Sequence, residues 1–230
     1  MNSNVIADER ARPFFVKIKR SPSGRNFISE ARASEEYFVR PEILPEILSN
    51  QEIKTTEIRF YGKHLWYHAE FEGQLVGWVK KAAIKTNYRR LDVPLMAGDN
   101  DVAGALSMLL AYFDKPFDYD ELVTQFKDLD TTAAQAKIGD TIRDSGTVSR
   151  DISGATLKTL NRQIDRGRPV IVMIADSSQS LYVSPRFVVV TGYSRRNIFY
   201  NDAVLNRKLK TTNQTLKKGW QGSQFYAISC

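Results

Sequence analysis

The chain is poor in the residues that disulfides, metal sites and acid–base catalysis most often use. Its 230 residues include one cysteine, Cys230, and two histidines, His64 and His68. A single thiol excludes an intramolecular disulfide and a cysteine-rich zinc site. Residues 69–230 contain no imidazole, so a Ser/His/Asp or Cys/His mechanism confined to that stretch lacks its usual base. We expect neither a metal nor a cofactor.

Long apolar runs are also missing. Runs such as 170–175 and 187–190 fall far short of the roughly 20 residues that a membrane-spanning helix needs. Residues 1–12 hold no apolar segment ahead of a small-residue cleavage site, which predicts either a cytosolic start or the start of a mature or trimmed secreted protein. The rest, 42% hydrophobic with 33 basic and 26 acidic residues, is typical of one large or two small globular domains.

The use of acidic residues changes near residue 90. Residues 1–90 hold ten Glu and one Asp, whereas residues 91–230 hold one Glu and fourteen Asp. This change predicts two domains, 1–90 and 91–230, joined near Asn87–Leu91. The first carries 16 basic against 11 acidic residues and the second 17 against 15, so the first is predicted to be the main polyanion binder.

Short aromatic or β-branched segments separated by turn residues fill the first domain: 14–19, 53–61, 65–71 and 75–79. This pattern predicts a small all-β barrel with half-exposed strands. Glu72-Gly73 predicts a hairpin turn. Residues 42–50, punctuated by Pro41 and Pro45, predict a loop with one helical turn.

The second domain begins with an extended piece, 91–96, followed by apolar residues at helical spacing from Val102 to Phe113. Asp99, Asn100 or Asp101 would cap that helix. Further helices are predicted at 119–126 and 154–165. Strands are predicted afterwards at 169–174, 186–191, 197–201 and 224–229. Helices first and an antiparallel sheet afterwards indicate an α+β domain.

Residues 73–84, GQLVGWVKKAAI, preceded by Trp66-Tyr67, resemble the closing part of a GW module, an SH3-like repeat of Gram-positive surface proteins. The resemblance extends over about residues 12–86 and implies binding of anionic wall polymers such as lipoteichoic acid. The implied ligand contacts are Trp66, Tyr67, Trp78, Lys80 and Lys81. The simpler interpretation is that Gly77 forms a bulge and Trp78 fills the barrel core, and for Trp78 we favour the core.

Four further segments occur in the order and spacing of another family: LDVPLM at 91–96, GRPVIV at 167–172, RFVVVTGY at 186–193, and Asn201-Asp202. Together with the Ala- and Leu-rich helix after residue 100, they resemble the C39-like branch of the papain-like cysteine peptidases. The resemblance covers about residues 91–230. It implies helices packed on an antiparallel sheet.

The resemblance places the catalytic roles on residues that cannot perform them. The oxyanion-hole glutamine falls at about Gly98, the nucleophilic cysteine at about Asp101, with Asp99 as the alternative, and the general-base histidine at Arg186. Only the orienting acid remains, as Asp202. A papain-type site needs a thiolate at a helix N-terminus and an imidazole that exchanges a proton near neutral pH. Arginine stays protonated there. We therefore predict no catalysis, with Ser107 an ordinary helix residue.

The exchange at the two catalytic positions suggests a replacement role. Asp101 and Arg186 would put a permanent carboxylate and guanidinium where the Cys/His pair stands, with Asp202 as a second acid for the arginine. An equally simple interpretation is two solvated residues at a relic cleft.

Three weaker patterns have ordinary explanations. His64 and His68 have the i, i+4 spacing of a zinc helix, but leucine occupies the place of the required glutamate and the surroundings predict a strand. A basic cluster could contact polyanions, although a solvated face is simpler: Arg207, Lys208, Lys210, Lys217 and Lys218, with Trp220. Cys230 is expected to be a frayed terminal thiol.

The sequence thus predicts an α+β protein with an SH3-like β-barrel at 1–90 and a C39-like, papain-like domain at 91–230. Its predicted role is non-catalytic binding or assembly at a Gram-positive cell surface, peripheral to the membrane or wall. The expected partner is an anionic wall polymer or another surface protein, and not nucleic acid. Two alternatives stay open: an active hydrolase built around Asp101, Asp202 and Ser107, and a cytosolic scaffold or nucleic-acid binder.

Overall fold

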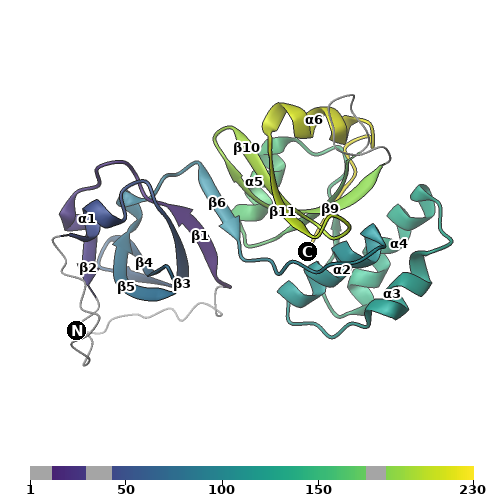
Figure 1. Ribbon diagram of the computed structural model, residues 1–230, viewed down its shortest axis with the longest axis horizontal. Coiled ribbons are helices and arrows are strands. Elements are labelled where there is room, and N and C mark those ends of the chain that lie inside the picture. The colour runs from purple at the N-terminus through teal and green to yellow at the C-terminus, as the bar shows by residue number, and fades with distance from the viewer. Residues whose placement is uncertain (1–11, 30–42, 175–184) are drawn as a thin grey trace. The chain divides into compact units, whose positions relative to one another are not determined.

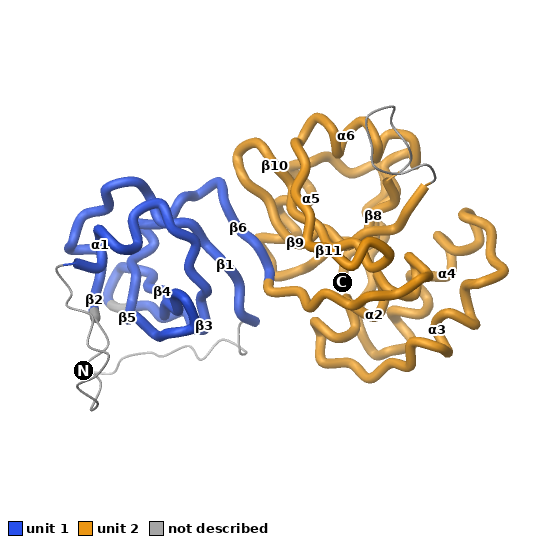
Figure 2. The backbone as a smooth tube through the Cα atoms, viewed as in Figure 1, with its two compact units in different colours: residues 1–91 blue, residues 92–230 orange. Residues whose placement is uncertain are grey.

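A computed structural model describes residues 12–29, 43–174 and 185–230 of the chain (Figure 1). The chain divides into two compact units, residues 1–91 and 92–230 (Figure 2), and each is described by itself below. This division lies one residue from the boundary drawn from acidic residue usage. Residues 41–42 of the predicted loop lie outside the described residues. Within the described ranges, no helix combines the length and apolar character that crossing a bilayer requires.

Unit 1 is built mainly of antiparallel strands in the order β2-β5-β4-β3-β1-β6. Its elements are β1 Phe14–Lys17, η1 Gly24–Asn26, β2 Phe27–Ser29, α1 Leu44–Ile47, β3 Glu52–Tyr61, β4 His64–Phe71, β5 Gln74–Lys80, η3 Lys81–Ala83 and β6 Tyr88–Leu91. The predicted strands are confirmed with small changes at their ends. The helical turn in the predicted loop is α1.

The chain leaving β5 returns to β1. The short helix η3 turns the chain, after which Lys19 N donates to Ala83 O at 2.8 Å and Lys85 N donates to Lys17 O at 2.8 Å. The sheet therefore curves round so that the segment after its fifth strand meets its first. The apolar side chains that this curvature encloses are buried: Phe14, Val16, Ile18, Ile53, Ala69 and Val79.

A bulge in β5 decides which of its side chains face inward. The register against β4 shifts beside Ala69, and Gly77, opposite Ala69, has a φ of 122°. An extra residue in one strand reverses the alternation of faces, so Val76 and Val79 are both buried while Trp78 is half-buried. The predicted bulge at Gly77 is present. The predicted core position of Trp78 is wrong, because the bulge turns its ring outward.

Unit 2 combines helices with an antiparallel sheet ordered β7-β12-β8-β9-β10-β11. Its helices are α2 Asp101–Tyr112, α3 Tyr119–Phe126, α4 Thr131–Asp144, α5 Leu157–Asp165 and α6 Asn213–Gln221. Its strands are β7 Arg150–Asp151, β8 Val170–Ile174, β9 Arg186–Ser194, β10 Asn197–Asp202, β11 Arg207–Thr212 and β12 Ala227–Ser229. The predicted mixture of helices and an antiparallel sheet is confirmed.

Each helix of unit 2 begins at a side-chain cap. The capping residues are Asn100, Asp118, Asp130, Thr156 and Thr212, and each accepts a hydrogen bond from the backbone N–H three residues later. Such a cap satisfies a donor that has no partner within the helix. This local chemistry explains why helices start at these points in the sequence.

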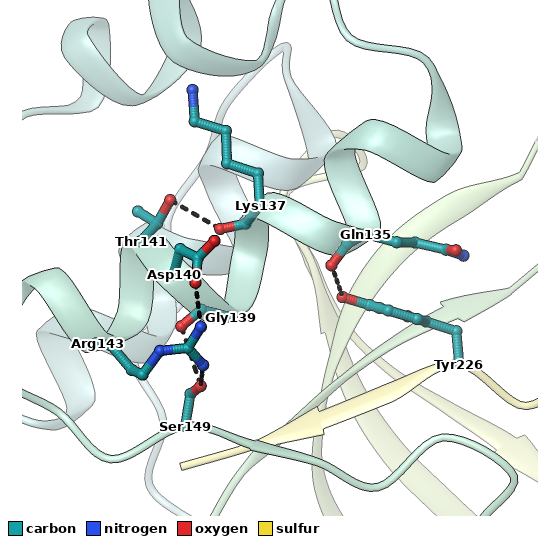
Figure 3. Close-up of polar contacts among 8 residues, drawn as sticks. All are labelled: Gln135, Lys137, Gly139, Asp140, Thr141, Arg143, Ser149 and Tyr226. Atoms are coloured by element: carbon teal, nitrogen blue, oxygen red, sulfur yellow. Dashed lines mark hydrogen bonds and ion pairs between the residues drawn. The ribbon is translucent and has the colours of Figure 1, made fainter.

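Helix α4 is one of the elements that the sequence pattern did not predict. Only four of its residues are buried, so its apolar stripe is narrow. Polar contacts hold it instead (Figure 3): Tyr226 Oη donates to Gln135 O at 2.9 Å, and Ser149 Oγ donates to Gly139 O at 2.9 Å. Strand β11 and helix α6 were also missed, because β11 is largely polar and α6 buries few residues.

Helix α2 is the centre of unit 2. Ten of its twelve residues are buried, as expected for a helix that is apolar on all sides. The end of β10 approaches it so closely that a Cβ atom at Gly104 would lie 2.2 Å from the Cβ of Ala203. Only glycine at position 104 allows this approach.

We expect Gly104→Ala to destabilise unit 2 by about 1–3 kcal/mol, the usual cost of overpacking. In an ordinary helix the same change stabilises by about 0.5–1 kcal/mol, so the sign tests the contact. Urea unfolding followed by Trp220 fluorescence, with Trp66 and Trp78 replaced by Phe, measures unit 2 alone. Adding Ala203→Gly should recover most of the loss. A stabilising Gly104→Ala would contradict the close approach.

Candidate functional site

The N-terminus of α2 presents an aspartate to the sheet. Asn100 caps the helix by accepting from Ala103 N at 2.9 Å, and Asp101 is the first helical residue. Both oxygens of Asp101 are engaged: Oδ1 accepts from Val102 N at 2.9 Å and Oδ2 accepts from Phe187 N at 2.8 Å. Because Phe187 belongs to β9, this carboxylate joins the helix to the sheet.

The surroundings of Asp101 do not strongly favour its charge. Burial raises the pKa of the Asp101 carboxyl, while the hydrogen bonds from Phe187 and Val102 and the charge of Arg186 oppose that rise. A folded-state pKa above that of the unfolded chain stabilises the fold below the unfolded pKa, and this stability is lost as the pH rises through the folded pKa. The fold therefore accommodates an ionised Asp101 at a cost in free energy.

Arg186 finds an acidic partner on the neighbouring strand. Its Nη1 lies 3.5 Å from Oδ2 of Asp202, whose side chain is fully buried, whereas the Arg186 side chain is 20% exposed. Leu205 N donates to the other oxygen of Asp202 at 2.9 Å. Of the two acids that the sequence suggested for Arg186, Asp202 is the one found in an ion pair with it. Asp101 is held by backbone N–H groups, and the charge of Arg186 also favours its ionised form.

The position assigned to the oxyanion-hole residue is filled by a tyrosine. A Cβ atom at Gly98 would lie 2.2 Å from Oη of Tyr119 and 2.7 Å from its Cζ. The hydroxyl donates to Asp99 Oδ1 at 3.0 Å and accepts from Asn100 N at 3.3 Å. No side chain at position 98 fits unless Tyr119 moves.

The structure brings into one place the four positions to which the resemblance assigns catalytic roles. Gly98 N donates to the carbonyl of Ala203, the neighbour of Asp202, at 3.2 Å. Asp101 reaches the backbone beside Arg186. The site therefore lies where the start of α2 meets the first residue of β9 and the last residue of β10.

The two other side chains that could act as nucleophiles, Ser107 and Cys230, are both buried. Ser107 is fully buried in the middle of α2, and its hydroxyl has no hydrogen-bond partner among the described residues. Cys230 is buried rather than frayed, which corrects the expectation for a chain end. Burial raises the pKa of its thiol to about 12, only partly offset by the charge of Arg168, so it stays protonated at neutral pH.

A family profile now gives this unit its place among known proteins. The profile of the Peptidase_C39 like family matches residues 102–228, more than half of the chain. The chain belongs to the C39-like peptidase family. The match contains Arg186 and Asp202 and begins one residue after Asp101.

One solved structure supports the same fold, and two others align with lower scores. A structure described as a C39-like peptidase from Bacillus anthracis aligns at 14% identity and TM-score 0.51, covering 60% of this chain and 94% of that one. A double glycine motif protease from an AMS/PCAT transporter, bound to its leader peptide, aligns at 15% identity and TM-score 0.45, covering 60% and 91%. A structure described as an autolysin from Listeria monocytogenes aligns at 11% identity and TM-score 0.29, covering 90% of this chain and 62% of that one. No curated protein matches the chain.

Outside the C39-like domain, the two histidines lie on β4. His64 is exposed, and the ring of His68 stacks on Trp78 with centroids 4.6 Å apart and planes 20° from parallel. Among the described residues, no group of three acidic, histidine or cysteine side chains could hold a metal ion. The i, i+4 spacing of the histidines falls on a strand, so it does not bring them together as it would on a helix.

The predicted ligand contacts of unit 1 divide between its interior and its surface. Tyr67 is buried and packs edge-to-face on Phe14, which removes it from the candidate contacts. Trp66 is on the outer side of the sheet but is also buried, at 8% exposed, so neither of these two aromatic residues of β4 is open to a ligand. Trp78 and Lys80 on β5 are half-buried on that outer side. Lys80 Nζ lies 5.8 Å from the Trp66 ring centre, and Lys81 is exposed just after β5. The outer face is defined here as Arg59, Trp66, His68, Trp78 and Lys80.

Two residues of these sites carried no signal in the sequence. Tyr119 lies 21 positions from Gly98, and nothing in the sequence around it predicts that its ring fills the space beside that glycine. Arg59 on β3 is opposite Trp66 on the neighbouring strand β4, and its guanidinium lies 5.1 Å from the centre of the Trp78 ring. Its position on an alternating strand was visible, but the strand register that brings it to Trp78 was not.

Double-mutant cycles can compare how strongly Asp202 and Asp101 each interact with Arg186. We expect a coupling free energy of about 1–3 kcal/mol between Arg186→Met and Asp202→Asn, because removing one partner leaves a charge in a partly buried place. Asparagine can still accept from Leu205 N. The matched cycle of Arg186→Met with Asp101→Asn should give under about 0.5 kcal/mol. Urea unfolding reported by Trp220 measures both, and a larger coupling to Asp101 would contradict the pairing described here.

Proposed function

We propose that this chain is a non-catalytic member of the C39-like peptidase family that binds an anionic wall polymer and serves recognition or assembly at a cell surface. The observation that carries the first part is the state of the α2 N-terminus. There a carboxylate, already bound by the backbone of α2 and β9, stands at the nucleophile position that the family resemblance assigns.

The chemistry of the relic site supports the absence of catalysis. An acyl transfer of the papain type needs a thiolate, a base that returns its proton and donors aimed at the developing oxyanion. Asp101 is not a thiolate, and Arg186 cannot accept a proton at physiological pH. Tyr119 fills the space beside Gly98 where an oxyanion donor would lie. Each requirement fails separately, so a single substitution would not restore turnover.

The strand arrangement of unit 1 supports the proposal of an SH3-like barrel. Its sheet curves round, and a 3-10 turn, η3, precedes the segment that pairs with β1. The GW-like residues 73–84 fall on β5, on η3 and on the start of that segment. The motif thus covers the part of the chain that closes the curved sheet.

The outer face has the chemistry that an anionic polymer requires. Arg59 and Lys80 lie over the rings of Trp78 and Trp66, which gives both cations a fixed position. Of the two rings only that of Trp78 is partly exposed, because Trp66 is buried beneath the surface. Ile28, paired with Trp78 across β2 and β5, is 49% exposed and adds apolar surface. Phosphate groups would bind the cations and release counterions, so binding should weaken steeply with salt. Such polymers lie outside the membrane, so the proposal includes a location at the cell surface.

The proposed loss of catalysis predicts no peptide hydrolysis above the buffer background. The test incubates the protein with a complex peptide mixture from pH 4 to 9, with and without thiol reductant, and follows cleavage by mass spectrometry. A papain-like enzyme is the positive control. The Cys230→Ser variant should behave identically, because its thiol is buried and protonated. Cleavage that disappears in Ser107→Ala or Asp202→Asn would establish the hydrolase alternative instead.

The polymer-binding part predicts which cations matter. Arg59→Gln/Lys80→Gln should lower the affinity for lipoteichoic acid by about tenfold or more, because each cation near an anionic surface contributes roughly 1 kcal/mol. The control Lys19→Gln/Arg20→Gln removes the same charge from exposed residues off the outer face and should change affinity less. Titrations at two salt concentrations, with duplex DNA as the comparison ligand, measure this. Equal losses in both variants, or tighter binding to DNA, would refute the proposed ligand site.

A further inference from the structure

The last 45 residues of the chain carry a strongly one-sided charge. Residues 186–230 contain eight Lys and Arg and a single acid, Asp202, which is buried against Arg186. The other seven cations are exposed: Arg195, Arg196, Arg207, Lys208, Lys210, Lys217 and Lys218. None of the seven forms an ion pair among the described residues.

These cations gather around one edge of the sheet of unit 2. Among the described residues, β11 pairs with β10 alone, so its other side is the end of the sheet. Lys208 and Lys210 lie two residues apart, which places them on the same face of β11. The turn between β9 and β10 adds Arg195 and Arg196, and it is tied to α6 because Asn213 N donates to Arg196 O at 2.9 Å. These cations therefore lie on a strand, on a helix and in a turn that a backbone hydrogen bond holds to that helix.

An edge strand with unpaired backbone groups is a template for adding another strand. Lysines on such an edge usually prevent this, because a neutral or basic strand would bury or repel them. The same lysines favour a strand that carries carboxylates at matching positions. The edge of β11 is thus guarded against most extended segments and open to an acidic one.

We propose that the edge of β11 binds an extended acidic peptide segment of a partner protein as an added strand, with its carboxylates facing Lys208 and Lys210. The spacing of the two lysines along β11 supports a peptide as the ligand. An added strand has the same spacing as β11, about 6.6 Å between residues on one face, so two partner residues that are two positions apart would lie opposite Lys208 and Lys210. Arg195, Arg196 and the two lysines of α6 supply a wider positive field that speeds encounter.

The composition of the surface disfavours a single-stranded nucleic acid. Proteins that hold such strands combine cations with exposed aromatic rings on which bases stack. Throughout residues 186–230, all of which the structure describes, no aromatic side chain is exposed, and Trp220 is fully buried. These cations belong to unit 2 and include no residue of the outer face of unit 1, so the proposal does not rest on polymer binding by that face.

The experiment uses the full chain and a short synthetic peptide that alternates glutamate with threonine, followed by fluorescence anisotropy. We expect Lys208→Glu/Lys210→Glu to weaken binding by about tenfold or more. The control Lys217→Glu/Lys218→Glu makes the same charge change on α6 and should weaken it less. Circular dichroism confirms that both variants are folded.

Two modified peptides separate strand addition from attraction between charges. N-methylation of alternate residues removes the N–H groups along one edge of the peptide, and a second peptide carries the modification on the other edge. In strand addition only one of the two loses binding, because only one edge faces β11. If both N-methylated peptides bind as well as the parent, if the α6 control loses as much affinity, or if duplex DNA or lipoteichoic acid binds this surface more tightly than the peptide, the proposal is overturned.

Discussion

The carboxylate of Asp101 is the interaction on which the arrangement of unit 2 depends. It accepts one N–H from the first turn of α2 and one from β9, and so fixes the start of the central helix against the sheet. Helix α2 is buried on nearly all sides, so its position determines where its neighbours pack. Burial raises the pKa of this carboxyl. The two N–H groups keep it in place although full ionisation there costs free energy.

That interaction also bears on the proposed loss of catalysis. A helix N-terminus favours a negative charge, and in a cysteine peptidase that preference can serve a reactive thiolate. Here the charge is a carboxylate whose two oxygens already have donors. The guanidinium of Arg186 is likewise occupied by Asp202, and Tyr119 covers Gly98. We infer that a reactive arrangement has been exchanged for a cohesive one, in which the same positions hold α2, β9 and β10 together.

The net charge of each domain and the distribution of charge within it predict different binding surfaces. A count assigns the larger basic excess to residues 1–90 and only two net charges to 91–230. The count hides a separation within the second domain, because fourteen of its fifteen acids precede residue 186. Electrostatic steering depends on the local field rather than on the total. Unit 2 can therefore present a basic edge at β11 while its overall charge is close to balanced.

The sequence by itself determined most elements with a strong period. Its composition also predicted a boundary near residue 91, and its residue chemistry predicted that Gly98, Asp101 and Arg186 cannot perform the roles that the resemblance assigns to them. These depend on local composition, spacing and residue chemistry. The sequence did not predict helix α4 or strand β11. Helix α4 buries few residues and β11 is largely exposed, so neither has a clear periodic pattern of apolar residues. Only the tertiary structure decided that Arg186 pairs with Asp202, that Trp78 faces outward and that Tyr119 lies over Gly98. Each of these depends on strand register, on a bulge, or on contacts between distant residues, and no local pattern encodes them.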